Sequence, residues 1–162
     1  MRSSLIQIGT WPPGTQTPAR VASAPRQRSA AERHIINPWS WQDAFGFTQA
    51  NEVTRAGRTI FCAGQTSVDE DGRPVHAGDI RAQLERSLDN LELVLEGAGA
   101  GMGDVVRLNY SRRMSEPSSA LGRSSSNASP AECRTASTLL GVQTLAFPEL
   151  LVEIEATAVV GP

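Results

Sequence analysis

An amphipathic helix between residues 79 and 97 is the feature that most constrains how this chain can fold. Apolar residues recur in it at spacings of three and four: Ile80, Leu84, Leu88, Leu91 and Leu95. This spacing places one apolar stripe along a helix of 3.6 residues per turn. Asp79 can cap the first turn, and Gly97, Gly99 and Gly101 are typical of a helix end. The helix must therefore bury one face against other elements.

A short apolar strand and a polar turn lead into this helix. Residues 59–63 include Ile, Phe and Cys and are closed by Gly64, which is typical of a buried strand. We expect Cys62 to pack there as a small apolar side chain. Residues 69–74 then supply Asp, Gly and Pro, which favour a tight turn because they bond their own backbone or fix φ.

Further apolar runs predict the remaining strands. Residues 46–55 alternate loosely and lie just before the strand that starts at Arg58, so we expect the two to form a β-hairpin. Residues 104–109 and 134–146 suggest two more strands, and 150–160 alternate most clearly between two faces. The predicted order is β-β-α-β, an unassigned interval, and then β-β.

The composition bounds the chemistry. The 162 residues suffice for one domain with a core, and a net charge of −2 gives no general attraction for nucleic acid. All 15 basic residues are Arg, which excludes a lysine Schiff base but allows Arg to bind carboxylate or phosphate. Cys62 and Cys133, with His34 and His76, match neither a disulfide framework nor a zinc site. With no transmembrane run and no secretory segment, we expect a cytoplasmic protein.

Two stretches do not fit this pattern. Residues 1–37 lack apolar periodicity and set several arginines against one acid, Glu32. This composition predicts a disordered or mispredicted tail, with a basic targeting segment as the alternative, and leaves residues 38–162 as the folded domain. Residues 110–132 are rich in serine and have no helical period, yet a loop of that length is uncommon inside a compact domain.

Several stretches together resemble the reactive intermediate deaminase (Rid) family, also described as the YjgF/YER057c/UK114 proteins. The matching pieces are AGQTSVDEDGRPV, RAQLERSLDNLELVLEGAG, GDVVRLN and LLVEIEATAVV, which lie in the family's order. The resemblance implies an α+β, chorismate-mutase-like (RidA-like) fold of order β-β-α-β-(α)-β-β. It also implies a homotrimer with a central barrel and with ligand pockets in the clefts between subunits.

The resemblance further implies an activity. Well-known members hydrolyse 2-imino acids, the enamine/imine products of other enzymes, to 2-oxo acids and ammonia without a metal or cofactor. This chemistry needs a cation for the substrate carboxylate and a positioned acid or base for the attacking water. The partners implied are a small imine, enamine or related carbonyl metabolite and two further copies of the chain, with no nucleic acid and no membrane.

The family's site residues carry over incompletely. Glu153, the first Glu of VEIEA, falls on the glutamate that positions the water, and Gly64 and Gln65 match the Gly-Gln of the pocket strand. Phe47 stands where typical members have a pocket tyrosine. Ser137 stands where deaminase-active members carry the Arg that binds the substrate carboxylate.

Two arginines are the candidate substitutes for that lost cation. Arg107 lies on a neighbouring predicted strand, and Arg134 lies three residues before Ser137. A shift of three reverses the side-chain face on a strand, so Arg134 would need a bulge or the loop before the strand. Losing a charge-assisted pair costs on the order of 2–5 kcal/mol of substrate binding.

Other readings stay open. The Ser137 substitution favours a non-catalytic ligand-binding or regulatory trimer, and ribonuclease action is disfavoured because no basic and aromatic patch stands out. Glu153 also fits the wet face of an alternating strand with no catalytic role. In the family, residues 110–132 would hold the end of a strand and a second amphipathic helix. We interpret this interval as read in a shifted frame until near Cys133, which retranslating the coding DNA in the other frames tests.

Overall fold

The computed structural model describes residues 31–114 and 134–162 of the chain. Their elements follow one another in this order: β1 (Glu32–Ile36), η1 (Trp41–Phe45), β2 (Ala50–Thr54), β3 (Arg58–Thr66), α1 (Ile80–Gly97), η2 (Met102–Asp104), β4 (Val105–Arg113), β5 (Ala136–Val142) and β6 (Val152–Val160). None of the helices within these ranges has the length and apolarity needed to cross a membrane.

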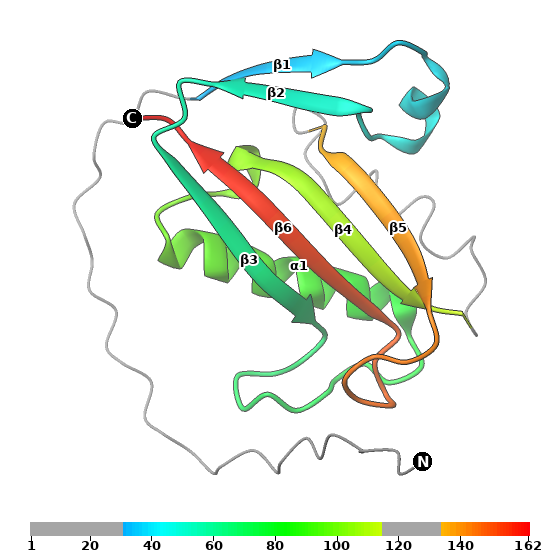
Figure 1. The fold of residues 1–162 in the computed structure, drawn as a ribbon. Coiled ribbons are helices and arrows are strands. Elements are labelled where there is room, and N and C mark those ends of the chain that lie inside the picture. The colour runs from blue at the N-terminus through cyan, green and yellow to red at the C-terminus, as the bar shows by residue number, and fades with distance from the viewer. Residues whose placement is uncertain (1–30, 115–133) are drawn as a thin grey trace, which may run out of the picture.

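The main sheet has four strands in the order β3-β6-β4-β5. Strand β6 is antiparallel to both β3 and β4, whereas β4 and β5 are parallel. Helix α1 lies across one face of this sheet, and the two-stranded β1-β2 sheet lies beyond the ends where β3, β4 and β5 begin (Figure 1). The other face of the four-stranded sheet carries no helix within the described residues.

The predicted helix is confirmed in its start and its buried face. The Asp79 carboxylate accepts hydrogen bonds from the backbone N–H groups of Arg81 and Ala82, each at 3.1 Å. Three leucines of the predicted stripe are fully buried, and they are Leu84, Leu91 and Leu95. They pack on β4 and β6 residues such as Leu108 and Ile154, so the core lies between α1 and the sheet.

The predicted hairpin between residues 46–55 and β3 is wrong. Strand β2 pairs with β1, from Glu32 opposite Thr54 to Ile36 opposite Ala50. The chain then turns at Arg55, whose φ is 56°, and the Gly57 N–H donates to Val160 at 2.8 Å, so β3 joins β6 instead. The alternating pattern correctly indicates each strand but does not specify its partner.

The predicted boundaries also change. Strand β1 lies within residues 1–37, so the folded part begins before residue 38, while residues 1–30 of the predicted tail lie outside the described residues. The predicted strand at 104–109 is confirmed and continues to Arg113, so 110–113 of the unassigned interval are strand. Residues 115–132 of that interval, where the second helix and the shifted frame are predicted, lie outside the described residues.

Candidate functional site

Glu153 lies near the start of β6, between two neighbouring strands. Its partners across the sheet are Thr66 on β3 and Ser111 on β4. Val152 and Ile154, on either side of it in the chain, are fully buried toward α1. Because successive side chains of a strand point to opposite faces, the Glu153 carboxylate lies on the face away from the helix.

A β-bulge in β3 makes room for this carboxylate. Between the Cys62–Ala156 and Gln65–Ile154 pairs, β3 has two residues where β6 has only Glu155. One of these two is Gly64, and a Cβ added there would lie 1.8 Å from Oε1 of Glu153. The missing side chain of Gly64 therefore lets the carboxylate rest directly against the backbone of β3.

The surroundings favour the protonated form of Glu153. Partial burial raises the pKa of its carboxyl group, and the negative charge of Glu155 raises it further. Glu155 itself is exposed on the same face of β6. A carboxyl group with a raised pKa is suited to exchange protons with a water molecule near neutral pH.

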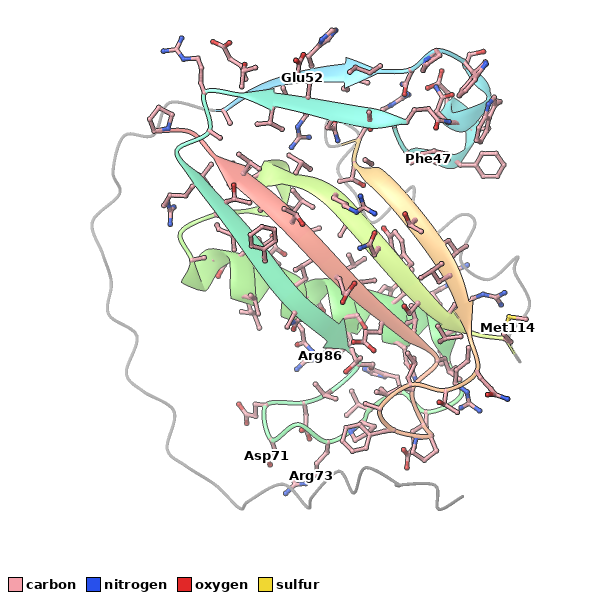
Figure 2. The ribbon with its side chains drawn as sticks, viewed as in Figure 1. Phe47, Glu52, Asp71, Arg73, Arg86 and Met114 are labelled. Carbon is pink, nitrogen blue, oxygen red and sulfur yellow. The ribbon has the colours of Figure 1, made fainter. Side chains whose placement is uncertain are left out.

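Helix α1 holds the end of β3 that borders this site. Nδ2 of Asn90 donates to the Thr66 carbonyl at 2.9 Å and to the Val68 carbonyl at 3.1 Å. Nε of Arg86 donates to the same Val68 carbonyl at 3.0 Å. Figure 2 shows Arg86 beside the end of β3. Two helix side chains thus fix the backbone of the strand on one side of Glu153.

Gln83 of α1 holds the approach to β6 on the other side. Its Nε2 donates to the carbonyls of His76, at 3.1 Å, and Glu149, at 2.8 Å. Its Oε1 accepts the Leu151 N–H at 2.7 Å, two residues before Glu153. Gln83 is fully buried, so these bonds lie out of water. The sequence pattern missed this role, although a Gln inside an apolar stripe is a signal of a buried polar contact.

The other predicted pocket residues gather at the opposite end of the sheet. Phe47 follows η1 and precedes Thr48, which bridges to Ala136 at the start of β5. Figure 2 shows Phe47 at this end of the molecule, far from Arg86. The Phe47 ring lies 5.7 Å from that of Trp41, edge to face. Nη1 of Arg134 forms an ion pair with Oδ1 of Asp43 in η1.

Ser137 and Arg107 do not reach Glu153 within this chain. Ser137 pairs with Leu108, whose side chain is buried toward α1, so Ser137 lies on the opposite face from Glu153. Its hydroxyl bonds the Thr135 hydroxyl at 2.9 Å. Arg107 shares the face of Glu153, but it lies four residues before Ser111, which corresponds to about 13 Å along β4. Its Nε donates to Asn109 at 3.1 Å.

One cation that the sequence pattern missed lies nearer to Glu153. Arg113 stands two residues beyond Ser111 on β4, on the same face, at the diagonal position to Glu153. Its Nη1 donates to the Pro148 carbonyl in the loop before β6. It was missed because the end of β4 falls in the unassigned interval. The structure therefore brings Glu153, Gly64 and Arg113 to one end of the sheet, and Phe47, Arg134 and Ser137 to the other. Gln65 lies at the Glu153 end, but it pairs with the buried Ile154 and so lies on the opposite face from Glu153.

Comparisons with known proteins agree with this architecture. A profile of the family described as endoribonuclease L-PSP matches residues 44–160. A RutC family protein of Pyrococcus abyssi is 36% identical over 58 residues, 36% of this chain and 46% of that protein. The 2-iminobutanoate/2-iminopropanoate deaminase of Dermatophagoides farinae is 31% identical over 78 residues, 48% of this chain and 59% of the deaminase. The matches thus span about half the length of these relatives.

Solved structures extend the likeness over most of the chain. A Rid protein of unknown function from Yersinia pestis is 38% identical, with a TM-score of 0.72 over 78% of this chain and 98% of its own. A YjgF/YER057c/UK114 family member from Mycobacterium tuberculosis is 28% identical, with a TM-score of 0.53 over 79% of this chain and 99% of its own. These similarities confirm the predicted α+β family fold.

Proposed function

Given that this chain belongs to the YjgF/YER057c/UK114 (Rid) family, we propose that it hydrolyses a small imine or enamine at Glu153. The expected substrates are reactive 2-imino acids, which give 2-oxo acids and ammonia. The deaminase of Dermatophagoides farinae, whose name states this kind of substrate, supports the choice by its similarity.

The reaction requires little of the protein. Water adds its oxygen to the imine carbon, Glu153 accepts a water proton, and the carbinolamine that forms then loses ammonia as its nitrogen is protonated. The carbonyl product and ammonia contain all the atoms of the imine and the water. A positioned carboxylate contributes typically about 10²–10⁴-fold to such proton transfers.

The observation that carries the proposal is the position of the Glu153 carboxylate against the backbone of β3. Its Oε1 lies against the backbone at Gly64, in the bulge of β3. Side chains of α1 hold the end of β3 and the residue before β6. A solvated carboxylate on a wet strand face needs neither the bulge nor the absent side chain. Burial and Glu155 raise the pKa of Glu153, which suits a group that both accepts and returns a proton.

We also propose that the working form is a homotrimer. The predicted site residues lie at two ends of one protomer's sheet, with Glu153 and Gly64 at one end and Phe47 and Ser137 at the other. A pocket between subunits would place one end of each protomer beside the other end of its neighbour. Light scattering or analytical ultracentrifugation of the purified protein tests the trimer.

The test of the activity is a coupled assay on freshly generated 2-iminopropionate and 2-iminobutyrate. The wild type should accelerate their decay to the oxo acids, and Glu153→Ala should lose at least about 100-fold of this acceleration. Glu96→Ala, an exposed change on α1, is the control for general effects of losing a carboxylate. A folded wild type that leaves both decay rates unchanged would reject the proposal.

A non-catalytic metabolite-binding trimer is the second candidate. Two points favour it: the family resemblance places Ser137 where deaminase-active members carry the carboxylate-binding Arg, and the predicted substitute Arg134 forms an ion pair with Asp43. Under this alternative the wild type binds 2-oxobutanoate in a ligand-observed NMR experiment, Glu153→Ala alters the affinity, and no imine decays faster.

A further inference from the structure

The position of Arg113 bears on the departure that the family resemblance implies for this chain, which is Ser137 in place of the carboxylate-binding Arg of deaminase-active members. Arg113 is the last residue of β4, and the alternation of buried and partly exposed residues along β4 puts it on the face of Ser111 and Glu153. Diagonal neighbours across an antiparallel pair lie about 7–8 Å apart. Neither of the two arginines that the sequence pattern singled out, Arg107 and Arg134, lies so near to Glu153.

The Arg113 guanidinium is held in place and retains most of its donors. Its Nη1 donates to the Pro148 carbonyl, which anchors the side chain over the loop that leads into β6. A guanidinium has five N–H donors, and this bond uses one of them. Arg134 differs because the Asp43 carboxylate already neutralises its charge. The carbonyl of Pro148 orients Arg113 without removing its charge.

Arg113 and Glu153 leave a gap between their charged groups. Within the described ranges, the ion pairs do not include Arg113 with Glu153, although both lie on one face. The pKa of Glu153 is raised by burial and by Glu155, the opposite of what a guanidinium in contact would cause. The gap suits a bound group that contacts both side chains.

A 2-imino acid carries the two groups that Arg113 and Glu153 could bind together. Its carboxylate is bonded directly to the imine carbon, so one end can bind a guanidinium while water attacks the adjacent atom. We propose that Arg113 binds the substrate carboxylate in this chain, in place of the Arg that Ser137 has replaced. This inference rests on the proposed function, because Glu153 must be the group that positions the water.

The test compares two imines that differ only in the carboxylate. An amino-acid oxidase converts leucine to 2-imino-4-methylpentanoate, and a flavin amine oxidase converts 3-methylbutylamine to 3-methylbutan-1-imine. A fall in the initial rate of semicarbazone formation reports the hydrolysis of either imine. The proteins are the full chain, Arg113→Gln, Arg113→Lys, and Arg81→Gln, which removes an exposed arginine on α1 as the matched control.

If Arg113 binds the substrate carboxylate, replacing it should lower kcat/KM on the imino acid much more than on the simple imine. Arg113→Gln should lose about 30-fold or more in kcat/KM on the imino acid, corresponding to one charge-assisted bidentate pair, and should change less than about threefold on the simple imine. Arg113→Lys should recover part of the loss, and Arg81→Gln should resemble the wild type. Equal losses on both imines, or no loss on the imino acid, would overturn the assignment of Arg113.

A binding measurement separates this inference from the proposed function. If the folded wild type accelerates neither imine, the proposed hydrolysis fails, and NMR titrations with 2-oxobutanoate and 2-oxobutanamide then decide the role of Arg113. A wild-type preference for the carboxylate over the amide, lost in Arg113→Gln, supports carboxylate binding without catalysis. A preference that survives in Arg113→Gln, or no preference in the wild type, rejects it.

Discussion

The two ends of the main sheet are built in different ways. At the Glu153 end, helix α1 holds both flanking strands through hydrogen bonds between its side chains and their backbone. Asn90 of α1 donates to the end of β3, and Gln83 of α1 accepts from Leu151, just before β6. At the Phe47 end, the start of β5 is joined to the β2 side by a backbone hydrogen bond from Thr48 to Thr135, by the Asn51 amide, which donates to the Arg134 carbonyl, and by an ion pair between exposed side chains, Arg134 and Asp43. The first end surrounds one partly buried carboxylate, whereas the second carries an exposed ion pair and exposed aromatic side chains.

This difference suggests that the two ends of the sheet have different roles. A catalytic carboxylate must stay within a fraction of an ångström of its working position, and buried hydrogen bonds to backbone atoms provide that rigidity. A surface that meets another subunit needs complementary shape and apolar area more than internal rigidity. The exposed aromatic residues Trp41 and Phe45 beside Phe47 agree with the second requirement.

Of these substitutions, Gly64→Ala should have the largest effect, and this effect should be on activity rather than on stability. The added Cβ would lie 1.8 Å from Oε1 of Glu153, so the carboxylate must move. Because that atom ends a flexible side chain, we expect stability to fall by less than about 1 kcal/mol while activity falls about 100-fold. Urea denaturation and the imine assay, run on the same preparation, measure both. A variant that retains activity would show that the contact with Gly64 is incidental.

Gln83→Leu tests whether α1 secures the Glu153 end. The change introduces an apolar side chain of similar size and removes the two donated bonds and one accepted bond of a fully buried amide. Leaving three backbone groups without these partners should lower the free energy of unfolding by about 2–4 kcal/mol. Urea denaturation measures this, with Glu85→Gln on the exposed side of α1 as the control. A loss of stability no larger than the control's would show that Gln83 does not secure the Glu153 end.

The Asp43–Arg134 pair should contribute much less to stability. The two side chains are 48% and 39% exposed, so solvent screens their attraction. A double-mutant cycle with Asp43→Asn and Arg134→Gln should give a coupling energy of about 0.2–1 kcal/mol that falls in high salt. A coupling comparable to the Gln83 effect would contradict the distinction between the two ends.

The smallest expected effect is that of Glu153→Gln on the way the free energy of unfolding depends on pH, and its sign is definite. Because the folded state raises the pKa of Glu153, the native protein binds this proton more tightly than the unfolded chain does. The stabilising contribution of protonation is present below the unfolded pKa and is lost as the pH rises through the folded pKa. Glu153→Gln should therefore be more stable than the wild type at pH 7, with the advantage shrinking toward pH 4.

Local patterns in the sequence were sufficient for the helix and most strands. The spacing from Ile80 to Leu95 predicted both the helix and its buried face, and the alternation from Leu150 onward predicted β6. Both features depend on neighbours within a few residues. The partner of β2 is β1, which lies in the stretch that the composition predicted to be a tail. Asn37-Pro38 and Gly46 favour turns between the two strands, but a turn signal does not by itself specify which strand β2 pairs with.

The site was predictable only as far as its motif extends. The VEIEA motif indicated Glu153, and Gly-Gln indicated the strand beside it, but the bulge that aims Gly64 at Glu153 depends on pairing between β3 and β6. Arg113 was missed because the end of β4 falls in the unassigned interval, and because its nearness to Glu153 depends on the pairing of β4 with β6. Placing Arg134 needed the position of η1, which no periodicity encodes.

The pH dependence of kcat/KM tests whether the ionised Glu153 carboxylate positions the attacking water. Activity should fall as the pH drops through the raised pKa of Glu153, and the neutral change Glu155→Gln should move this fall to lower pH because it removes a charge that raises that pKa. Measuring wild type and Glu155→Gln on the same imine gives both curves. A fall at the same pH in both proteins, or no fall in the acid range, would contradict the claim.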